Sequence, residues 1–157
     1  MTIEIRDATA ADAEAATEVM RRSITELCVA DHNNDSKILD GWLANKKQEV
    51  FRSWLQQGNQ SYLVAVTDGQ IVCVGGVTDA GLITLNYVSP EARFRGVSRA
   101  MVAALEQRAR ARGNRDCTLA STATARRFYL ACGYVETGPP DRSFGTESGF
   151  PMRKPLV

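Results

Sequence analysis

The residues best suited to chemistry in this chain follow an apolar run that ends at Val88. There Val88-x-Pro90 leads into Arg93-x-x-Gly96-x-Ser98, and helical spacing follows. A strand that turns into the start of a helix leaves backbone N–H groups without acceptors, and such a turn can bind an anion. The segment lacks the closing Lys and Ser or Thr of a nucleotide P-loop and the three glycines of a dinucleotide fingerprint. It therefore predicts a phosphate-binding turn of another kind.

A second segment, Thr122–Tyr134, carries Ala125, Phe128, Tyr129 and Gly133 at the spacing T-x-x-A-x-x-F-Y-x-x-x-G-Y. Together the two segments resemble the GNAT superfamily of acyl-CoA N-acyltransferases. Its pyrophosphate loop is Q/R-x-x-G-x-G/A, and N-x-x-A-x-x-F-Y-x-x-x-G-F/Y follows. The two segments stand in the family's order and at its separation. The resemblance covers nearly the whole chain, with the specific motifs in residues 85–134.

The resemblance implies acetyl-CoA as co-substrate, with its pantetheine arm in a gap between two splayed parallel strands, Leu82–Val88 and Asp116–Ala120. Three residues depart from the family pattern: Ser98 replaces Gly or Ala, Thr122 replaces Asn, and Phe94 is bulkier than usual. These departures concern affinity and acyl-CoA preference. The expected coenzyme-binding residues are Tyr87, Val88, Arg93, Phe94, Arg95, Gly96, Val97, Ser98, Arg99, Thr122, Ala125 and Tyr129.

The mechanism that the resemblance implies is direct attack of an amine on the thioester. The Val88 backbone N–H is the expected donor to the carbonyl oxygen as it gains charge. Tyr129 is the expected general acid for the leaving sulfur, because a phenol stays protonated at neutral pH. The alternative for Tyr129 is a core aromatic whose hydroxyl is satisfied elsewhere.

The general base and the acceptor site are less defined. The strand that ends at Val88 offers only Thr84 and Asn86 as polar candidates, and neither is a useful base near neutral pH. A water relay or an acid from elsewhere, with Glu26 as one candidate, would have to serve. The loop Arg142–Thr146 could line the acceptor mouth or form a plain hairpin. Five residues are candidates for binding the acceptor amine: Glu26, Asp31, His32, Asp35 and Asn86.

Two interpretations of residues 31–35 remain open. One of Asp31, His32 and Asp35 deprotonates or anchors the amine, or the segment is a solvated loop. Two other functions also remain open for the chain. A non-catalytic acyl-CoA sensor would keep residues 93–98 without an acid role for Tyr129, and the missing strand carboxylate favours it. An interaction domain would need neither motif.

Charge is unevenly distributed along the chain. Residues 93–127 hold nine Arg and two acids, whereas residues 1–92 hold seven bases and thirteen acids. The basic segment favours a polyanionic cofactor such as coenzyme A, and the acidic segment favours a cationic amine. A pI near 7.7 argues against nucleic-acid binding.

Composition points to one domain over residues 1–157. The chain has 44% hydrophobic residues and no apolar run long enough for a membrane helix or a signal peptide. A cytoplasmic protein without a membrane partner is therefore expected. We expect it to be a monomer or a homodimer. The four cysteines show no Cys-x-x-Cys spacing, and His32 is the only histidine, so neither a metal site nor a disulfide framework is expected.

The sequence predicts strands and helices that alternate along the chain around these residues. Ile3–Arg6 predicts a strand, followed by a helix capped at Thr9 and a second helical region that reaches Gln57. Residues 62–88 predict an antiparallel meander with a tight turn at Asp68-Gly69. After it come a helix over 97–112, a strand over 116–120, a helix over 122–131, and closing strands over 134–137 and 150–153. This order predicts an α+β fold, a GNAT-like α/β/α arrangement around a central mixed, mostly antiparallel sheet.

Overall fold

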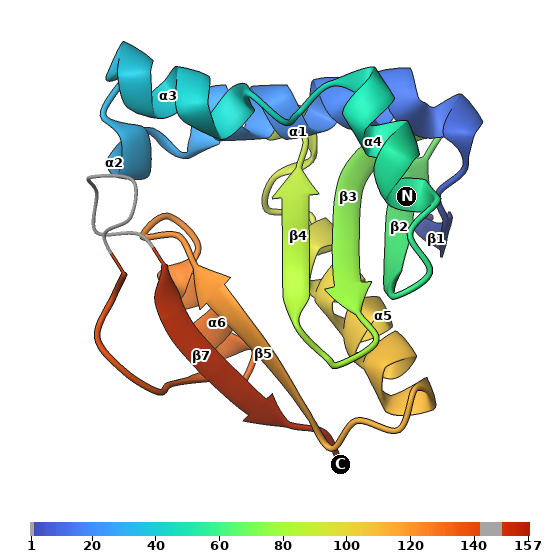
Figure 1. Ribbon diagram of the computed structural model, residues 1–157, viewed down its shortest axis with the longest axis vertical. Coiled ribbons are helices and arrows are strands. Elements are labelled where there is room, and N and C mark those ends of the chain that lie inside the picture. The colour runs from blue at the N-terminus through green and yellow to red at the C-terminus, as the bar shows by residue number, and fades with distance from the viewer. Residues whose placement is uncertain (1, 142–148) are drawn as a thin grey trace.

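The fold is built on two antiparallel sheets that meet at one point, as the computed structural model of residues 2–141 and 149–157 shows (Figure 1). One sheet has the strand order β1 (Glu4–Asp7), β2 (Gln60–Thr67), β3 (Gln70–Thr78), β4 (Ile83–Val88). The other has the order β5 (Asp116–Ser121), β7 (Phe150–Pro155), β6 (Val135–Glu136). A parallel bridge between Leu82 and Thr118 joins them. From this bridge β4 and β5 diverge, which confirms the predicted splayed pair.

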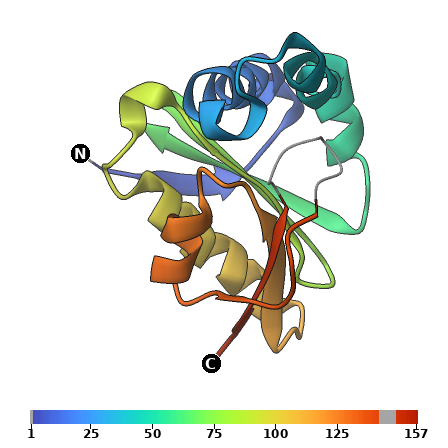
Figure 2. The same cartoon turned by 90° about the vertical axis from the view of Figure 1, so that its left-hand side faces the viewer.

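Helices cover both faces of the first sheet (Figures 1 and 2). On one face lie α1 (Ala13–Leu27) and α4 (Gln48–Leu55), with α3 (Ser36–Leu43) packed on α1. On the other face lies α5 (Val97–Ala111). The short helix α2 (Val29–His32) follows α1, the short helix α6 (Arg126–Ala131) follows β5, and 3-10 turns form at Ala10–Asp12 and Pro90–Ala92. Within the described residues, no helix is long and apolar enough to cross a membrane.

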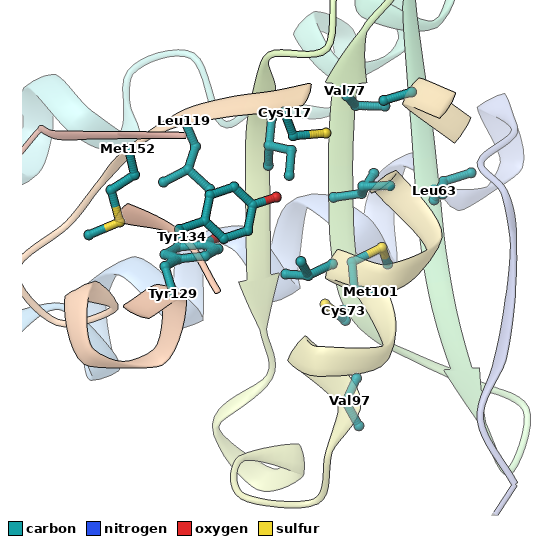
Figure 3. Packing of buried hydrophobic residues seen from close by; sticks show 14 of the residues in the cluster. Leu63, Cys73, Val77, Val97, Met101, Cys117, Leu119, Tyr129, Tyr134 and Met152 are labelled. Carbon is teal, nitrogen blue, oxygen red and sulfur yellow. The ribbon is translucent and has the colours of Figure 1, made fainter. Parts of the chain in front are cut away.

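Each face of the first sheet has its own hydrophobic cluster. Along β2, alternate side chains point to opposite faces, so Tyr62 and Val64 pack toward α1 while Leu63 and Ala65 pack toward α5. The α5-side cluster continues into the second sheet through Leu119, Tyr134 and Met152, part of which Figure 3 shows. The two sheets therefore share a core on the α5 side only.

Several predicted helices differ from the structure, among them the helix expected over 122–131, which begins at Arg126. The helical region expected to reach Gln57 consists of α3 and α4, separated at residues 44–47. The first helix ends at Leu27, before residues 31–35, and the separate short helix α2 runs into that segment, where Asn33 and Asn34 follow it with φ 51° and 58°. Asn tolerates the left-handed region, so these two residues end the helix within the segment.

The predicted tight turn between β2 and β3 is confirmed. Asp68 and Gly69 both have positive φ, 51° and 76°, as a type I′ hairpin turn requires. The closing strands are also present, with β6 shorter and β7 longer than expected.

Gly81 is expected to be the most sensitive glycine at the base of the splayed pair. Its φ is +89°, and a Cβ there would lie 2.8 Å from the backbone oxygen of Asp116. Left-handed backbone costs a residue with a Cβ about 1–2 kcal/mol, and the clash adds to that. We expect Gly81→Ala to lower the free energy of unfolding by about 2 kcal/mol in urea titrations. Gly69→Ala is the matched control, because its φ is +76° with nothing within 4 Å; equal losses would contradict the clash.

Candidate active site

A cavity of about 650 Å³ lies where β4 and β5 diverge. Its walls come from β4, the first turn of α5, β5, the turn before α6, and the last turn of α1. Most of the sequence-predicted coenzyme residues line it: Tyr87, Val88, Arg93, Phe94, Gly96, Val97, Ser98, Arg99, Thr122, Ala125 and Tyr129, together with Asn86. Arg95 stands on the same turn but not in the lining.

The edge of β4 that faces the cavity carries backbone groups not used by β3. The Ser89 N–H donates to the Val72 carbonyl at 2.7 Å, and Val88 stands opposite Cys73 in the ladder. Because hydrogen-bonded and non-hydrogen-bonded pairs alternate between antiparallel strands, the peptide groups of Val88 and Asn86 point away from β3. They are directed into the gap, where an extended ligand could pair with them.

The first turn of α5 follows β4 in the chain and presents backbone N–H groups that have no acceptor within the helix. Gly96 is the N-cap, at φ +80°, and no side chain caps the helix. The first helical bond runs from the Ala100 N–H to the Gly96 carbonyl, so the N–H groups of Val97, Ser98 and Arg99 precede the hydrogen-bonded part of the helix. The positive end of the helix dipole adds to their attraction for an anion.

Three arginines surround this turn. The side chains of Arg93, Arg95 and Arg99 are exposed, and none forms an ion pair within the part of the chain that the structure describes. Unpaired cations beside free N–H groups fit a ligand with more than one negative charge. The pyrophosphate of coenzyme A has this chemistry.

Tyr129 lies at the inner end of the cavity. Its buried hydroxyl accepts a hydrogen bond from Asn86 Nδ2 at 3.3 Å, and Asn86 Oδ1 accepts one from Cys73 Sγ at 3.4 Å. This orientation of the amide leaves the phenol proton available to a ligand. Burial raises the pKa of Tyr129 above its usual value, so the hydroxyl is protonated at neutral pH.

The Tyr87 side chain projects to the face of β4 opposite Asn86 and Val88, toward α1 and α3. Its hydroxyl accepts a hydrogen bond from Trp42 Nε1 at 3.1 Å, and burial raises its pKa to about 12. The lining on this side also includes Ser23, Leu27 and Cys28 from the last turn of α1. Sequence reasoning did not identify these three, because apolar helical spacing indicates a core face and not which part of that face crosses a gap.

The four residues predicted at the exit of the first helix do not line the cavity. Glu26 is exposed and pairs with Arg22 at 2.9 Å. Asp35 accepts from the backbone N–H groups of Lys37 and Ile38, and so caps α3. His32 is fully buried, with Nε2 2.9 Å from the Ile24 carbonyl.

Asp31 is buried as well, at 1% exposed. Its carboxylate accepts from the Ala123 N–H at 2.6 Å and from the Thr124 N–H and hydroxyl at 3.2 and 2.6 Å. The solvated-loop interpretation is therefore wrong for Asp31 and His32. Asp31 instead holds α2 against the turn that precedes α6. That turn, and not Asp31 itself, lines the cavity. The other predicted acceptor segment, Arg142–Thr146, lies outside the described residues.

Asp31→Asn is expected to lower the free energy of unfolding by about 2 kcal/mol. Hydrogen bonds to a charged acceptor are stronger than neutral ones, and the NH₂ group of Asn cannot accept the bonds that the replaced carboxylate oxygen accepts. Asp35→Asn is the matched control. It makes the same chemical change at an exposed N-cap, where Asn and Asp are equivalent, so its effect should be near zero. Urea titration of both variants checks this, and equal losses would contradict the assigned role of Asp31.

The family model described as an acetyltransferase (GNAT) domain matches residues 28–156. Among solved structures, the chain is similar to a GCN5-related N-acetyltransferase from Rhodopseudomonas palustris, with 24% identity and a TM-score of 0.87 over 99% of this chain and 97% of that one. It is also similar to the PaiA N-acetyltransferase from Thermoplasma acidophilum in complex with coenzyme A, with 20% identity and a TM-score of 0.82 over 99% and 100%.

No curated protein matches the sequence significantly. At these identities the solved structures establish the fold, whereas the family model rests on the sequence itself. The matched residues span most of the chain and include both the first turn of α5 and Tyr129. The chain belongs to the family of GNAT acetyltransferase domains.

Proposed function

We propose that this protein transfers the acetyl group of acetyl-CoA to a primary amine, on a small molecule or a peptide, by direct attack. The observation that carries the proposal is the continuity of one cavity. It joins a helix N-terminus, with unpaired Arg93 and Arg99 in its lining, to a buried tyrosine hydroxyl along a free strand edge.

Acetyl-CoA fits this cavity in one direction. Its pyrophosphate accepts from the N–H groups that begin α5, with Arg93, Arg95 and Arg99 around it. An amide N–H of the pantetheine arm donates to the Val88 carbonyl on the free edge of β4, which leaves the Val88 N–H for the thioester. The thioester then reaches the buried end of the cavity, beside Tyr129.

The chemistry divides between two groups of the chain. The Val88 N–H donates to the thioester oxygen as the amine nitrogen forms the new C–N bond. The C–S bond breaks, and Tyr129 donates its proton to the sulfur. Tyr129 recovers a proton from solvent.

The amine approaches from the α1 side, past Ser23, Leu27, Cys28 and Tyr87. No Asp, Glu or His of the described chain lines the cavity, so in this proposal water takes the proton that the amine loses. Amines with a low pKa, such as the α-amino group near 8, then react more readily than alkylamines near 10.4.

A panel of small amines and peptides, incubated with acetyl-CoA, tests the proposal by thiol detection of released coenzyme A and by the mass of the acetylated product. Acceptor-dependent release supports transfer. The second candidate, a non-catalytic acyl-CoA sensor, is favoured by the lack of a carboxylate in the described lining. It would give a thermal shift with coenzyme A and no release with any acceptor.

A further inference from the structure

Phe94 combines three properties at the start of the pyrophosphate turn. Its side chain is 89% exposed, its φ is +64°, and the guanidinium carbon of Arg93 lies 4.3 Å from its ring centroid. It also lines the cavity between β4 and β5.

These properties do not serve packing within the chain. An exposed phenyl ring gains no burial, and a bulky residue in the left-handed region is strained. An exposed apolar side chain alone is common. Backbone strain at the rim of a ligand cavity, however, is typical of residues that a ligand requires.

The direction of the coenzyme brings one part of it to this ring. The acetyl end must reach buried Tyr129, and the pyrophosphate must meet the first turn of α5. The adenosine beyond the pyrophosphate therefore points out of the cavity, toward solvent. Phe94, exposed and in the cavity lining, lies two residues before Gly96, on the turn proposed to hold the phosphates, and so beside the expected path of the adenosine.

We propose that Phe94, with Arg93 against it, stacks on the adenine ring of acetyl-CoA. This inference rests on the proposed function. Base stacking on an aromatic side chain contributes enough to change affinity about tenfold when the ring is removed. The guanidinium of Arg93 adds a planar cation beside the same surface.

Calorimetry on the wild type, Phe94→Leu and Phe94→Tyr tests the proposal with three ligands: coenzyme A, 3′-phosphoadenosine 5′-phosphate and 4′-phosphopantetheine. All three proteins keep a side chain at the same strained position, so only the ring differs. Phe94→Leu should weaken binding of the two adenine-containing ligands about tenfold and leave the Kd of 4′-phosphopantetheine unchanged. Phe94→Tyr should bind all three like the wild type.

An equal loss for 4′-phosphopantetheine would overturn the proposal, because Phe94 would then act through the shape of the turn. Unchanged affinity for every ligand would overturn it too, and a change in sedimentation instead would assign the ring to contact with a second copy. Wild-type protein that binds coenzyme A but does not transfer acetyl would refute the proposed function while leaving the stacking result valid. Wild-type protein that binds none of the ligands would refute both.

Discussion

Replacing Tyr129 by Phe is expected to lower kcat by about 10²-fold, the scale for loss of a general acid, with little change in acetyl-CoA affinity. The change removes one hydroxyl from the buried end of the cavity and keeps the ring that packs there. Steady-state kinetics with the acceptor found in the amine panel measures kcat, and calorimetry measures binding. Since burial raises the pKa of Tyr129, we also expect no loss of kcat from its deprotonation below about pH 10.

Tyr134→Phe is the matched control. Tyr134 is also buried, and its ring centroid lies 5.7 Å from that of Tyr129. It does not line the cavity, and its hydroxyl donates to the Glu106 carboxylate at 2.7 Å. This variant loses the same atom from the same core, so its kcat should stay close to that of the wild type. Similar losses in both variants, or normal turnover of Tyr129→Phe, would assign Tyr129 to packing.

Gly96→Asp is expected to weaken acetyl-CoA binding on the order of 10³-fold. A carboxylate at the N-cap would stand next to the pyrophosphate, and two like charges about 4 Å apart repel by about 4 kcal/mol at an effective dielectric constant of 20. Calorimetry with acetyl-CoA measures the loss, and a urea titration shows whether the fold is kept.

Gly96→Ala separates the charge from the backbone. Both variants carry the strain of a Cβ at φ +80°, and no atom lies within 4 Å of that position. The alanine variant should therefore lose much less affinity than the aspartate variant. If the two bind acetyl-CoA equally well, the turn does not hold the pyrophosphate.

Several features of the site could be predicted because their causes are local. Turn chemistry at Asp68-Gly69 depends on two residues that accept positive φ. The turn from β4 into α5 likewise depends on Gly96 and on the apolar spacing on either side of it. The positions of Val88 and Tyr129 followed from the family resemblance, which placed both beside the splayed strands.

The four residues predicted to bind the acceptor amine at the end of the first helix do not line the cavity. Glu26, Asp31, His32 and Asp35 are polar residues near a helix end, and a sequence pattern cannot state whether such residues face a ligand or each find a partner. Asp31 finds its partners 92 and 93 residues away, at Ala123 and Thr124. A buried carboxylate requires such partners, but only the packing of α2 against the turn that precedes α6 supplies them.

The strand-to-helix turn, its free donors and its positive charge could be predicted, since these arise from neighbouring residues. Which groups meet across the gap between β4 and β5 depends on the packing of the whole chain. Asn86 contacts Tyr129 from a strand 43 positions away, and Leu27 and Cys28 reach the cavity because α1 crosses the end of β4. The physical reason is that a turn is set by short-range backbone preference, whereas the lining of a cavity depends on how two sheets and their helices pack.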